Sequence, residues 1–147
     1  MAEKKSIHSK IIEKQTYHNI KKAYDKLLFE LFDLFNEMGI TALQYDLLEV
    51  LELEGSSGLP IKKIGEQMLS RQPDVTRIVD RLEKMGLVER ERNGIDRRIV
   101  IVTISKKGAE LRREAGKRLL KIHKCQFKAF SDRDFEIFNQ LLEKLQE

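Results

Sequence analysis

Apolar residues recur at helical spacing along most of the chain and give way to strand-like composition in one short stretch. Apolar stripes at i, i+3, i+4 and i+7 predict amphipathic helices. Two segments rich in Val, Ile and Thr flank Asn93-Gly94, a pair typical of tight hairpins. The pattern therefore predicts a mainly α protein with a small β hairpin, an α+β fold, with helices over 11–38, 41–53, 61–69, 72–85, 105–129 and 131–145 and strands over 87–92 and 97–104.

The helix expected to start near Gln72 has two chemically different faces. Pro73 suits its first position, and Gly86 suits its end because glycine readily adopts a positive φ there. The apolar face, which must be buried, consists of Val75, Ile78, Val79, Leu82 and Met85. The opposite face, which includes Asp80, and the preceding turn are polar. We predict that they contact nucleic acid through Arg71, Gln72, Pro73, Asp74, Thr76, Arg77, Arg81 and Lys84.

The hairpin after this helix completes a winged helix-turn-helix pattern, in which two short helices and a basic hairpin fit the grooves of duplex DNA. Four arginines gather around the expected hairpin tip. Side chains two apart in an extended chain point the same way, so Asp96 is expected to orient the guanidinium of Arg98 for minor-groove entry. The wing is therefore predicted to bind DNA through Arg92, Asp96, Arg97 and Arg98, with Arg90 nearby.

The residues 72–90, the wing residues 96–98 and the run 102–108 together resemble the MarR family of winged-helix transcriptional regulators. The resemblance implies an obligate homodimer, a recognition helix in the major groove and a wing arginine in the minor groove. It also implies a brief strand at Leu59 that pairs with the wing. A small aromatic or lipophilic effector is implied between the DNA-binding lobe and the dimer helices, and we assign Tyr17, Tyr24 and Met38 to that pocket.

Amphipathic segments at both ends of the chain need a surface to cover them. A small DNA-binding lobe offers no third layer, so each segment is expected to pack on its counterpart in a second copy. The predicted division is a helical dimerisation region over 1–38 and 105–147 and a winged helix-turn-helix DNA-binding region over 39–104. The alternative is a bundle formed within one chain. A dimer of this type predicts a palindromic operator, and the resemblance predicts a ligand-responsive repressor.

Charge and composition agree with this assignment. The 147 residues fit one compact domain, and the net charge is +4. Ten Lys/Arg and seven Asp/Glu lie within 61–104, so most of the positive excess falls in the expected DNA-binding stretch. The N-terminus lacks the apolar segment of a signal peptide, and the longest apolar run, 99–102, cannot span a membrane. We predict a cytoplasmic protein without membrane contact.

Two other functions remain open at this point. One is a non-regulatory interaction or architectural module; the other is a redox-sensing regulator that uses Cys125, whose basic neighbours favour a thiolate. An incidental thiol is the preferred interpretation. No enzyme motif occurs, and the spacing of His8, His18 and His123 does not define a metal site, so we expect no catalysis, metal or cofactor.

Overall fold

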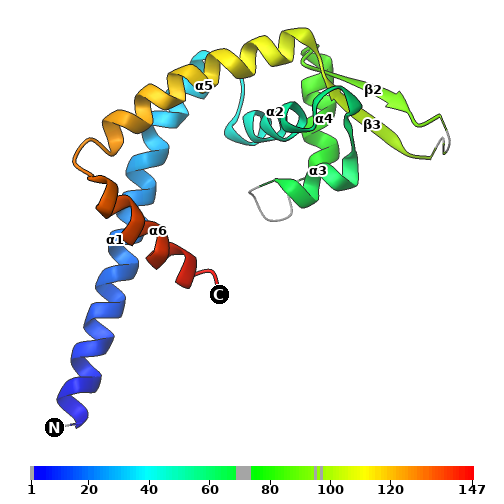
Figure 1. Cartoon of the computed structure of the whole chain (residues 1–147). Coiled ribbons are helices and arrows are strands. Elements are labelled where there is room, and N and C mark those ends of the chain that lie inside the picture. The colour runs from blue at the N-terminus through cyan, green and yellow to red at the C-terminus, as the bar shows by residue number, and fades with distance from the viewer. Residues whose placement is uncertain (1, 69–73, 95, 97) are drawn as a thin grey trace.

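The computed structural model describes residues 2–68, 74–94, 96 and 98–147, and it describes side chains from residue 11 onward. It confirms a mainly helical fold with a small sheet (Figure 1). The elements in chain order are α1 (Ala2–Glu37), α2 (Ala42–Glu54), the 3₁₀ turn η1 (Gly55–Ser57), β1 (Leu59–Pro60), α3 (Ile61–Gln67), α4 (Val75–Lys84), β2 (Val88–Arg92), β3 (Val100–Ile104), α5 (Lys106–Gln126) and α6 (Asp132–Lys144).

The chain forms one lobe joined to long helices. In Figure 1, α2, α3, α4 and the sheet gather at one end, and α5 leads from this lobe to α1. Helix α6 turns back from the end of α5, and the N-terminal half of α1 extends away from the lobe. The helix at the N-terminus begins at Ala2, earlier than the expected residue 11. The lobe contains the elements between residues 42 and 104, and the division into two functional regions remains a prediction.

The sheet is antiparallel, with β3 between β1 and β2. Leu59 pairs with Val102, which confirms the expected strand at Leu59. Strands β2 and β3 pair from Val88–Ile104 to Arg92–Val100. The expected start of the second strand at residue 97 is wrong, because β3 begins at Val100. The backbone N–H of Asn93 donates to the carbonyl of Ile99 at 2.9 Å and so closes a connection longer than the expected 93–96.

Local sequence signals account for most helix ends. Thr41 and Gln44 form a reciprocal capping box at the start of α2, and Ser105 and Ser131 cap α5 and α6. Gly86 has a φ of 71° at the end of α4. The expected start of this helix near Gln72 is wrong: α4 begins at Val75, because the carboxylate of Asp74 accepts a hydrogen bond from the backbone N–H of Arg77 at 3.1 Å.

Most of the core lies inside the lobe, where α2, α3 and α4 pack on the sheet, and it is continued by Leu34 and Phe35 of α1 and Leu119 of α5. Full burial of each aliphatic side chain contributes about 1.5–3 kcal/mol. On α2, Leu43 and Leu53 lie outside this core and are 38% and 83% exposed. The short η1 turn, Gly55–Ser57, connects α2 to β1. The largest fully buried side chains are Leu47, Leu48, Leu51, Ile64, Val79, Leu82, Leu87, Val88 and Val102.

Candidate nucleic-acid interface

Helix α4 buries one face and presents the other to solvent. Val75, Val79 and Leu82 are buried, and Ile78 and Met85 pack partly buried against the core, so the predicted apolar stripe is confirmed. Its hydrophobic residues fix the rotation of the helix about its axis. The exposed face consists of Thr76, Arg77, Arg81 and Lys84, with Asp74 at the N-cap.

One predicted member of that face, Asp80, is committed to a structural contact. Arg90 on β2 makes an ion pair with Asp80, and its Nε lies 3.4 Å from a carboxylate oxygen of Glu83. The Arg90 side chain is 23% exposed, so its expected place at the wing tip is wrong. The sequence pattern misplaced Arg90 because the alternation of side chains along a strand carries no information about a partner on the preceding helix. Arg90, Asp80 and Glu83 thus join α4 to the wing, and the Arg90 guanidinium is the partner of both carboxylates.

The wing presents Arg92, Asp96 and Arg98 to solvent at the end of the hairpin, which projects from the lobe (Figure 1). Asp96 accepts a hydrogen bond from the backbone N–H of Arg98 at 2.9 Å, and its own N–H donates to the side-chain oxygen of Asn93 at 3.1 Å. The expectation that Asp96 holds the Arg98 guanidinium is therefore corrected: Asp96 orders the loop backbone. Four predicted contact residues lie outside the described residues, namely Arg71, Gln72, Pro73 and Arg97.

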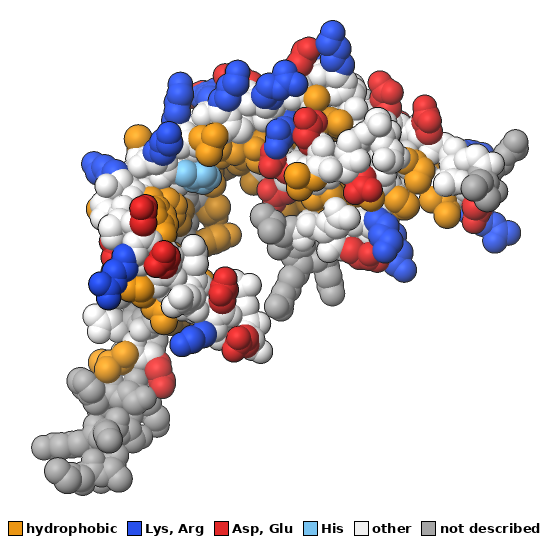
Figure 2. Space-filling model, viewed as in Figure 1, with side chains coloured by type: hydrophobic (Ala, Val, Ile, Leu, Met, Phe, Trp, Pro, Cys, Tyr) orange, Lys and Arg blue, Asp and Glu red, His pale blue; other side chains and the backbone are white. Residues whose placement is uncertain are grey.

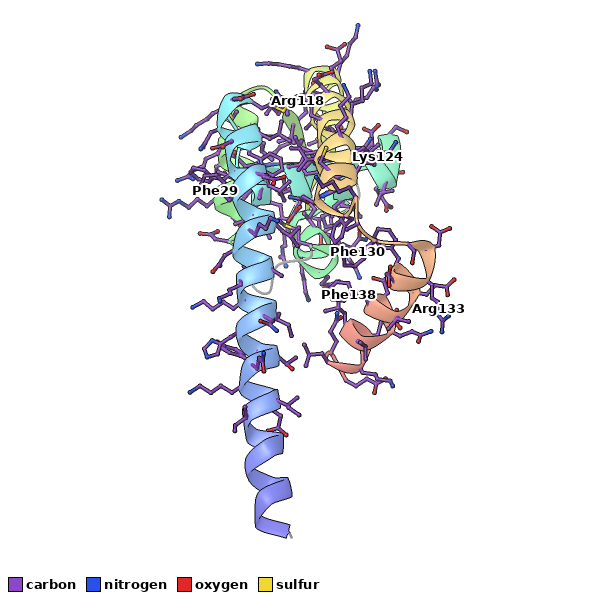
Figure 3. The ribbon with its side chains drawn as sticks, turned by 90° about the vertical axis from the view of Figure 1, so that its left-hand side faces the viewer. Phe29, Arg118, Lys124, Phe130, Arg133 and Phe138 are labelled. Atoms are coloured by element: carbon purple, nitrogen blue, oxygen red, sulfur yellow. The ribbon has the colours of Figure 1, made fainter. Side chains whose placement is uncertain are left out.

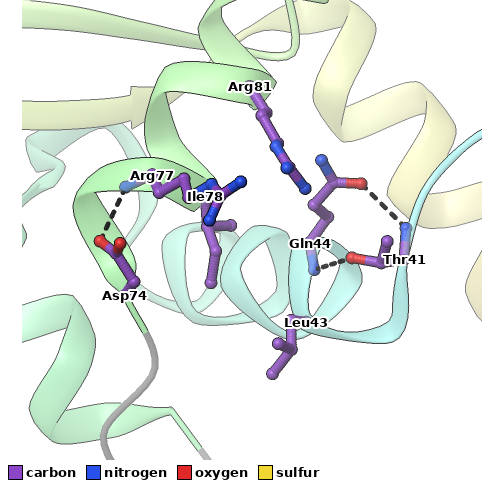
Figure 4. A pocket seen from close by; sticks show the side chains of 7 residues that line it. All are labelled: Thr41, Leu43, Gln44, Asp74, Arg77, Ile78 and Arg81. Atoms are coloured by element: carbon purple, nitrogen blue, oxygen red, sulfur yellow. Dashed lines mark hydrogen bonds between the residues drawn. The ribbon is translucent and has the colours of Figure 1, made fainter.

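A cleft of about 300 Å³ adjoins the exposed face of α4 (Figure 4). Arg77 and Arg81 come from α4, and the capping box at the start of α2 supplies the other wall. The capping box is a local pattern that the sequence predicts, but its place beside α4 depends on the packing of two helices that are far apart in the sequence. We call this site the α2–α4 cleft; it is lined by Thr41, Leu43, Gln44, Asp74, Arg77, Ile78 and Arg81.

The three residues assigned to an effector pocket do not converge within one chain. Tyr17 and Tyr24 are 65% and 59% exposed on α1, whereas Met38 packs against the lobe core. At 1.5 Å per residue, Tyr17 and Met38 lie roughly 30 Å apart along the helix direction. A small ligand within one chain therefore cannot contact both, and the assignment remains a prediction.

A second cavity, of about 490 Å³, lies between α2 and α5 and was not found from the sequence. The hydroxyl of Tyr45 donates to Glu49 at 2.8 Å, and the Nε of Arg112 donates to the same carboxylate oxygen. Burial and the bond to Glu49 raise the pKa of Tyr45 above its ordinary value, and the bond to Glu49 raises the pKa of Arg112. The lining residues are Tyr45, Glu49, Arg112, Arg113, Gly116, Lys117, Leu119, Leu120 and His123.

The remaining candidate side chains are separated. Cys125 is an exposed free thiol on α5, and His123 lies 3.0 Å from the side-chain oxygen of Gln126. Among the side chains that the structure describes, no group of His, Cys, Asp or Glu is arranged to hold a metal ion; His8 is not among them. In the same described part of the chain, no helix has both the length and the apolar character needed to cross a membrane.

The helices α2, α3 and α4, closed by a three-stranded sheet with a projecting hairpin, define a winged helix-turn-helix protein. Residues 40–100 match the model of the MarR family, and the chain belongs to this family of winged-helix regulators.

Curated relatives are named as transcriptional regulators. The organic hydroperoxide resistance transcriptional regulator of Bacillus subtilis is 34% identical over 82 residues, which cover 56% of this chain and 54% of the relative. The transcriptional repressor MdtR of the same organism is 29% identical over 90 residues, covering 61% of this chain and 57% of the relative. The matched segment thus spans little more than half the length of these relatives.

Solved structures share the fold across most of the chain. A MarR-like transcription regulator from Bacillus cereus superposes with a TM-score of 0.80 at 24% identity, covering 92% of this chain and 96% of the other. A cysteine-to-serine mutant of Escherichia coli MarR, solved with operator DNA, gives a TM-score of 0.76 at 22% identity, covering 87% and 91%. Bordetella bronchiseptica BpsR, whose DNA binding is regulated by 6-hydroxynicotinic acid, gives a TM-score of 0.77 at 22% identity, and the match covers 88% of this chain and 91% of BpsR.

Proposed function

We propose that this protein is a sequence-specific regulator of transcription that binds duplex DNA as a homodimer, recognises a palindromic operator and acts as a ligand-responsive repressor. The observation that carries the proposal is the exposed face of α4. The side chains of Arg77, Arg81 and Lys84 have no acidic partner among the described residues. Cations left free along one helix face are suited to contacts with phosphates.

The dimensions of the lobe suit this role. An α-helix with its side chains is about 10–12 Å in diameter and so fits the major groove, which is about 12 Å wide. Helix α4, Val75–Lys84, is about 15 Å long. Thr76 and Arg77 lie in its first turn, which is the part of a recognition helix that meets base edges. Arg92 and Arg98 on the projecting wing are then available to the neighbouring minor groove. The solved complex of E. coli MarR with operator DNA supports the same role for this lobe.

The helices outside the lobe support self-association. Large apolar side chains on α1 and α6 are 37–70% exposed on the single chain, more than scattered surface residues require. In Figure 3, Phe138 and Arg133 lie on different sides of α6, so the helix separates an apolar face from a charged one. Figure 2 shows hydrophobic side chains gathered on the surface where α5 runs alongside α1. The apolar residues concerned are Ile11, Ile12, Tyr17, Ile20, Tyr24, Leu28, Phe29 and Phe32 on α1 and Phe135, Ile137, Phe138 and Leu141 on α6.

Effector control is assigned to the cavity between α2 and α5. Tyr45, Glu49 and Arg112 offer hydroxyl, carboxylate and guanidinium groups around a space large enough for a small aromatic molecule. The cavity joins the lobe to α5, so a ligand that prefers one angle between them would change the placement of α4. The regulation of BpsR by 6-hydroxynicotinic acid supports an effector of this chemical kind.

Two alanine substitutions on α4 test the proposal. Arg77→Ala removes a side chain near the helix N-terminus and should cost about 1–3 kcal/mol on a DNA fragment selected by the protein while costing less on unrelated DNA. Lys84→Ala, at the other end of the face, should weaken both DNAs equally and lower the salt slope by about one unit. Fluorescence titrations at several salt concentrations measure both effects, with Arg133→Ala on α6 as the control.

The alternative functions give different results in the same titrations. A protein that binds selected and unrelated DNA with equal affinity is an architectural module. A protein that binds neither DNA is an interaction module of another kind. Either result would overturn the proposal.

A further inference from the structure

The α2–α4 cleft contains a buried amide group whose hydrogen-bonding capacity is only half used. Gln44 is 5% exposed, and its carbonyl oxygen accepts from the backbone N–H of Thr41 at 2.8 Å. That bond fixes the orientation of the amide, because the Thr41 N–H can only donate and must therefore face the oxygen. The Gln44 nitrogen consequently points the other way, toward the side of the cleft from which Arg81 extends (Figure 4).

No described residue accepts a hydrogen bond from that nitrogen. The nitrogen itself is not fully buried, because Arg90 Nε is the one described side-chain atom that is both buried and without a hydrogen-bond partner. The nitrogen lines a cleft that is open to the surface, and an acceptor from outside the chain can reach it. The capping box supplies a structural reason for the oxygen of Gln44, but it leaves the nitrogen without a function.

The charge around the cleft favours an anionic acceptor. Arg77 and Arg81 contribute two guanidinium groups, neither of which pairs with an acidic side chain among the described residues. Asp74 contributes one carboxylate, which is occupied in part as the cap of α4 through the N–H of Arg77. The start of α2 adds the positive end of a helix dipole at Thr41. The balance is therefore cationic, and the cleft offers donors on two walls.

We propose that the α2–α4 cleft binds one backbone phosphate of the DNA, with the Gln44 amide nitrogen as a hydrogen-bond donor and Arg81 as the countercharge. The inference rests on the proposed function and deepens it by giving α2 a role in DNA binding. A duplex that receives α4 in its major groove has a sugar–phosphate strand on each side of the helix. The cleft lies on one such side and shares Arg77 with the exposed face of α4.

This contact would position the lobe rather than read bases. A phosphate held between α2 and α4 fixes the depth and the rotation of α4 in the groove, because the two helices are joined through the rigid core. Leu43, exposed at the cleft, is placed to contact the adjoining sugar. Gln44 is therefore a positioning residue whose loss should affect affinity on every sequence.

Gln44→Glu tests the proposal without removing the capping box. A glutamate at this position still accepts from the Thr41 N–H, as in the usual Ser/Thr-x-x-Glu box, but it replaces the amide donor by a carboxylate oxygen. We expect DNA affinity to fall by at least about tenfold and the thermal midpoint to stay unchanged. Gln146→Glu is the matched control, since it makes the same chemical change at an exposed residue near the C-terminus.

Replacement of single phosphates by neutral methylphosphonates locates the contact. On a DNA fragment selected by the wild-type protein, one phosphate position beside the α4 site should lose about tenfold in affinity when neutralised. Gln44→Glu should be nearly insensitive to that same replacement, while remaining sensitive at other positions. Such coupling between one residue and one phosphate is what a direct contact predicts.

The outcomes distinguish a failure of the cleft assignment from a failure of the proposed function. If the wild-type protein binds no DNA, the proposed function fails. If the wild-type protein binds DNA and Gln44→Glu binds as tightly as Gln146→Glu, the cleft assignment fails while the proposed function stands. If Gln44→Glu binds weakly but stays as sensitive as wild type at every phosphate, its effect is general repulsion and the cleft assignment is again overturned.

Discussion

Two glycines on α5 allow the packing of this helix against the lobe to be tested with one kind of substitution. A Cβ at Gly108 would lie 2.0 Å from the carbonyl oxygen of Leu87 and 3.0 Å from a side-chain carbon of Ile104. The backbone N–H of Ser105 donates to the same Leu87 carbonyl at 3.0 Å, so the start of α5 is held against the start of β2. The contact point is backbone, which cannot move aside as a flexible side chain would.

We expect Gly108→Ala to destabilise the fold by about 1–3 kcal/mol. Alanine gains about 1 kcal/mol over glycine from helix propensity. Against this, relief of the overlap costs typically about 1–3 kcal/mol, and a lengthened Ser105–Leu87 hydrogen bond costs about 1 kcal/mol. The unfavourable contributions are larger because the overlap is with backbone atoms, so the two segments must separate.

Gly116→Ala is the matched control on the same helix. A Cβ at Gly116 would lie 3.4 Å from the hydroxyl of Tyr45, an ordinary contact distance. Helix propensity should therefore dominate and raise the free energy of unfolding by about 0.5–1 kcal/mol. Urea denaturation followed by circular dichroism measures both variants. If Gly108→Ala is as stable as wild type, the close approach of α5 to β2 is wrong.

Three further predictions concern pH, assembly and oxidation. Burial and Glu49 raise the pKa of Tyr45, so the neutral hydroxyl stabilises the folded state at pH values below the ordinary tyrosine pKa of about 10. The free energy of unfolding should therefore fall as the pH rises above about 10. A Tyr45→Phe variant that shows the same fall would contradict this prediction. Replacement of Leu141 and Leu145 by glutamate should release monomers with weak DNA binding, and sedimentation showing a monomeric wild type would remove the basis for the dimer. Cys125→Ser should leave DNA affinity and its response to peroxide unchanged; loss of peroxide-induced release in this variant would instead identify a redox sensor.

Features with a local cause could be predicted from the sequence. The buried stripe of α4, the capping box of Thr41 and the helix stop at Gly86 each depend on residues within about one or two helical turns, so spacing was sufficient. The helix-turn-helix and its wing follow from those elements in chain order. The same local signals placed the exposed cations Arg77 and Lys84 on one face of α4.

Features with a tertiary cause were missed or misplaced. Arg90 was placed at the wing tip, although its partners Asp80 and Glu83 lie on the preceding helix and draw it inward. The Asn93-Gly94 signal placed the start of the second wing strand at residue 97. Hydrogen bonds donated by the backbone N–H groups of Asp96 and Ile99 stabilise a longer connection, and β3 begins at Val100.

Both cavities depend on helix packing that no local pattern encodes. Tyr45 and Arg112 meet at one carboxylate although they are far apart in the sequence. Gln44 and Arg81 line one cleft for the same reason.

The most direct test of the central claim is selection of duplex DNA from a random pool by the purified protein, followed by sequencing. Sequence reading by α4 predicts enrichment of a palindrome whose half-sites are centred roughly 10 base pairs, or a multiple of that, apart. Arg77→Ala should select a pool with a weaker consensus at the half-sites. A wild-type protein that enriches no sequence, or only an asymmetric single site, would contradict a dimeric, sequence-specific regulator.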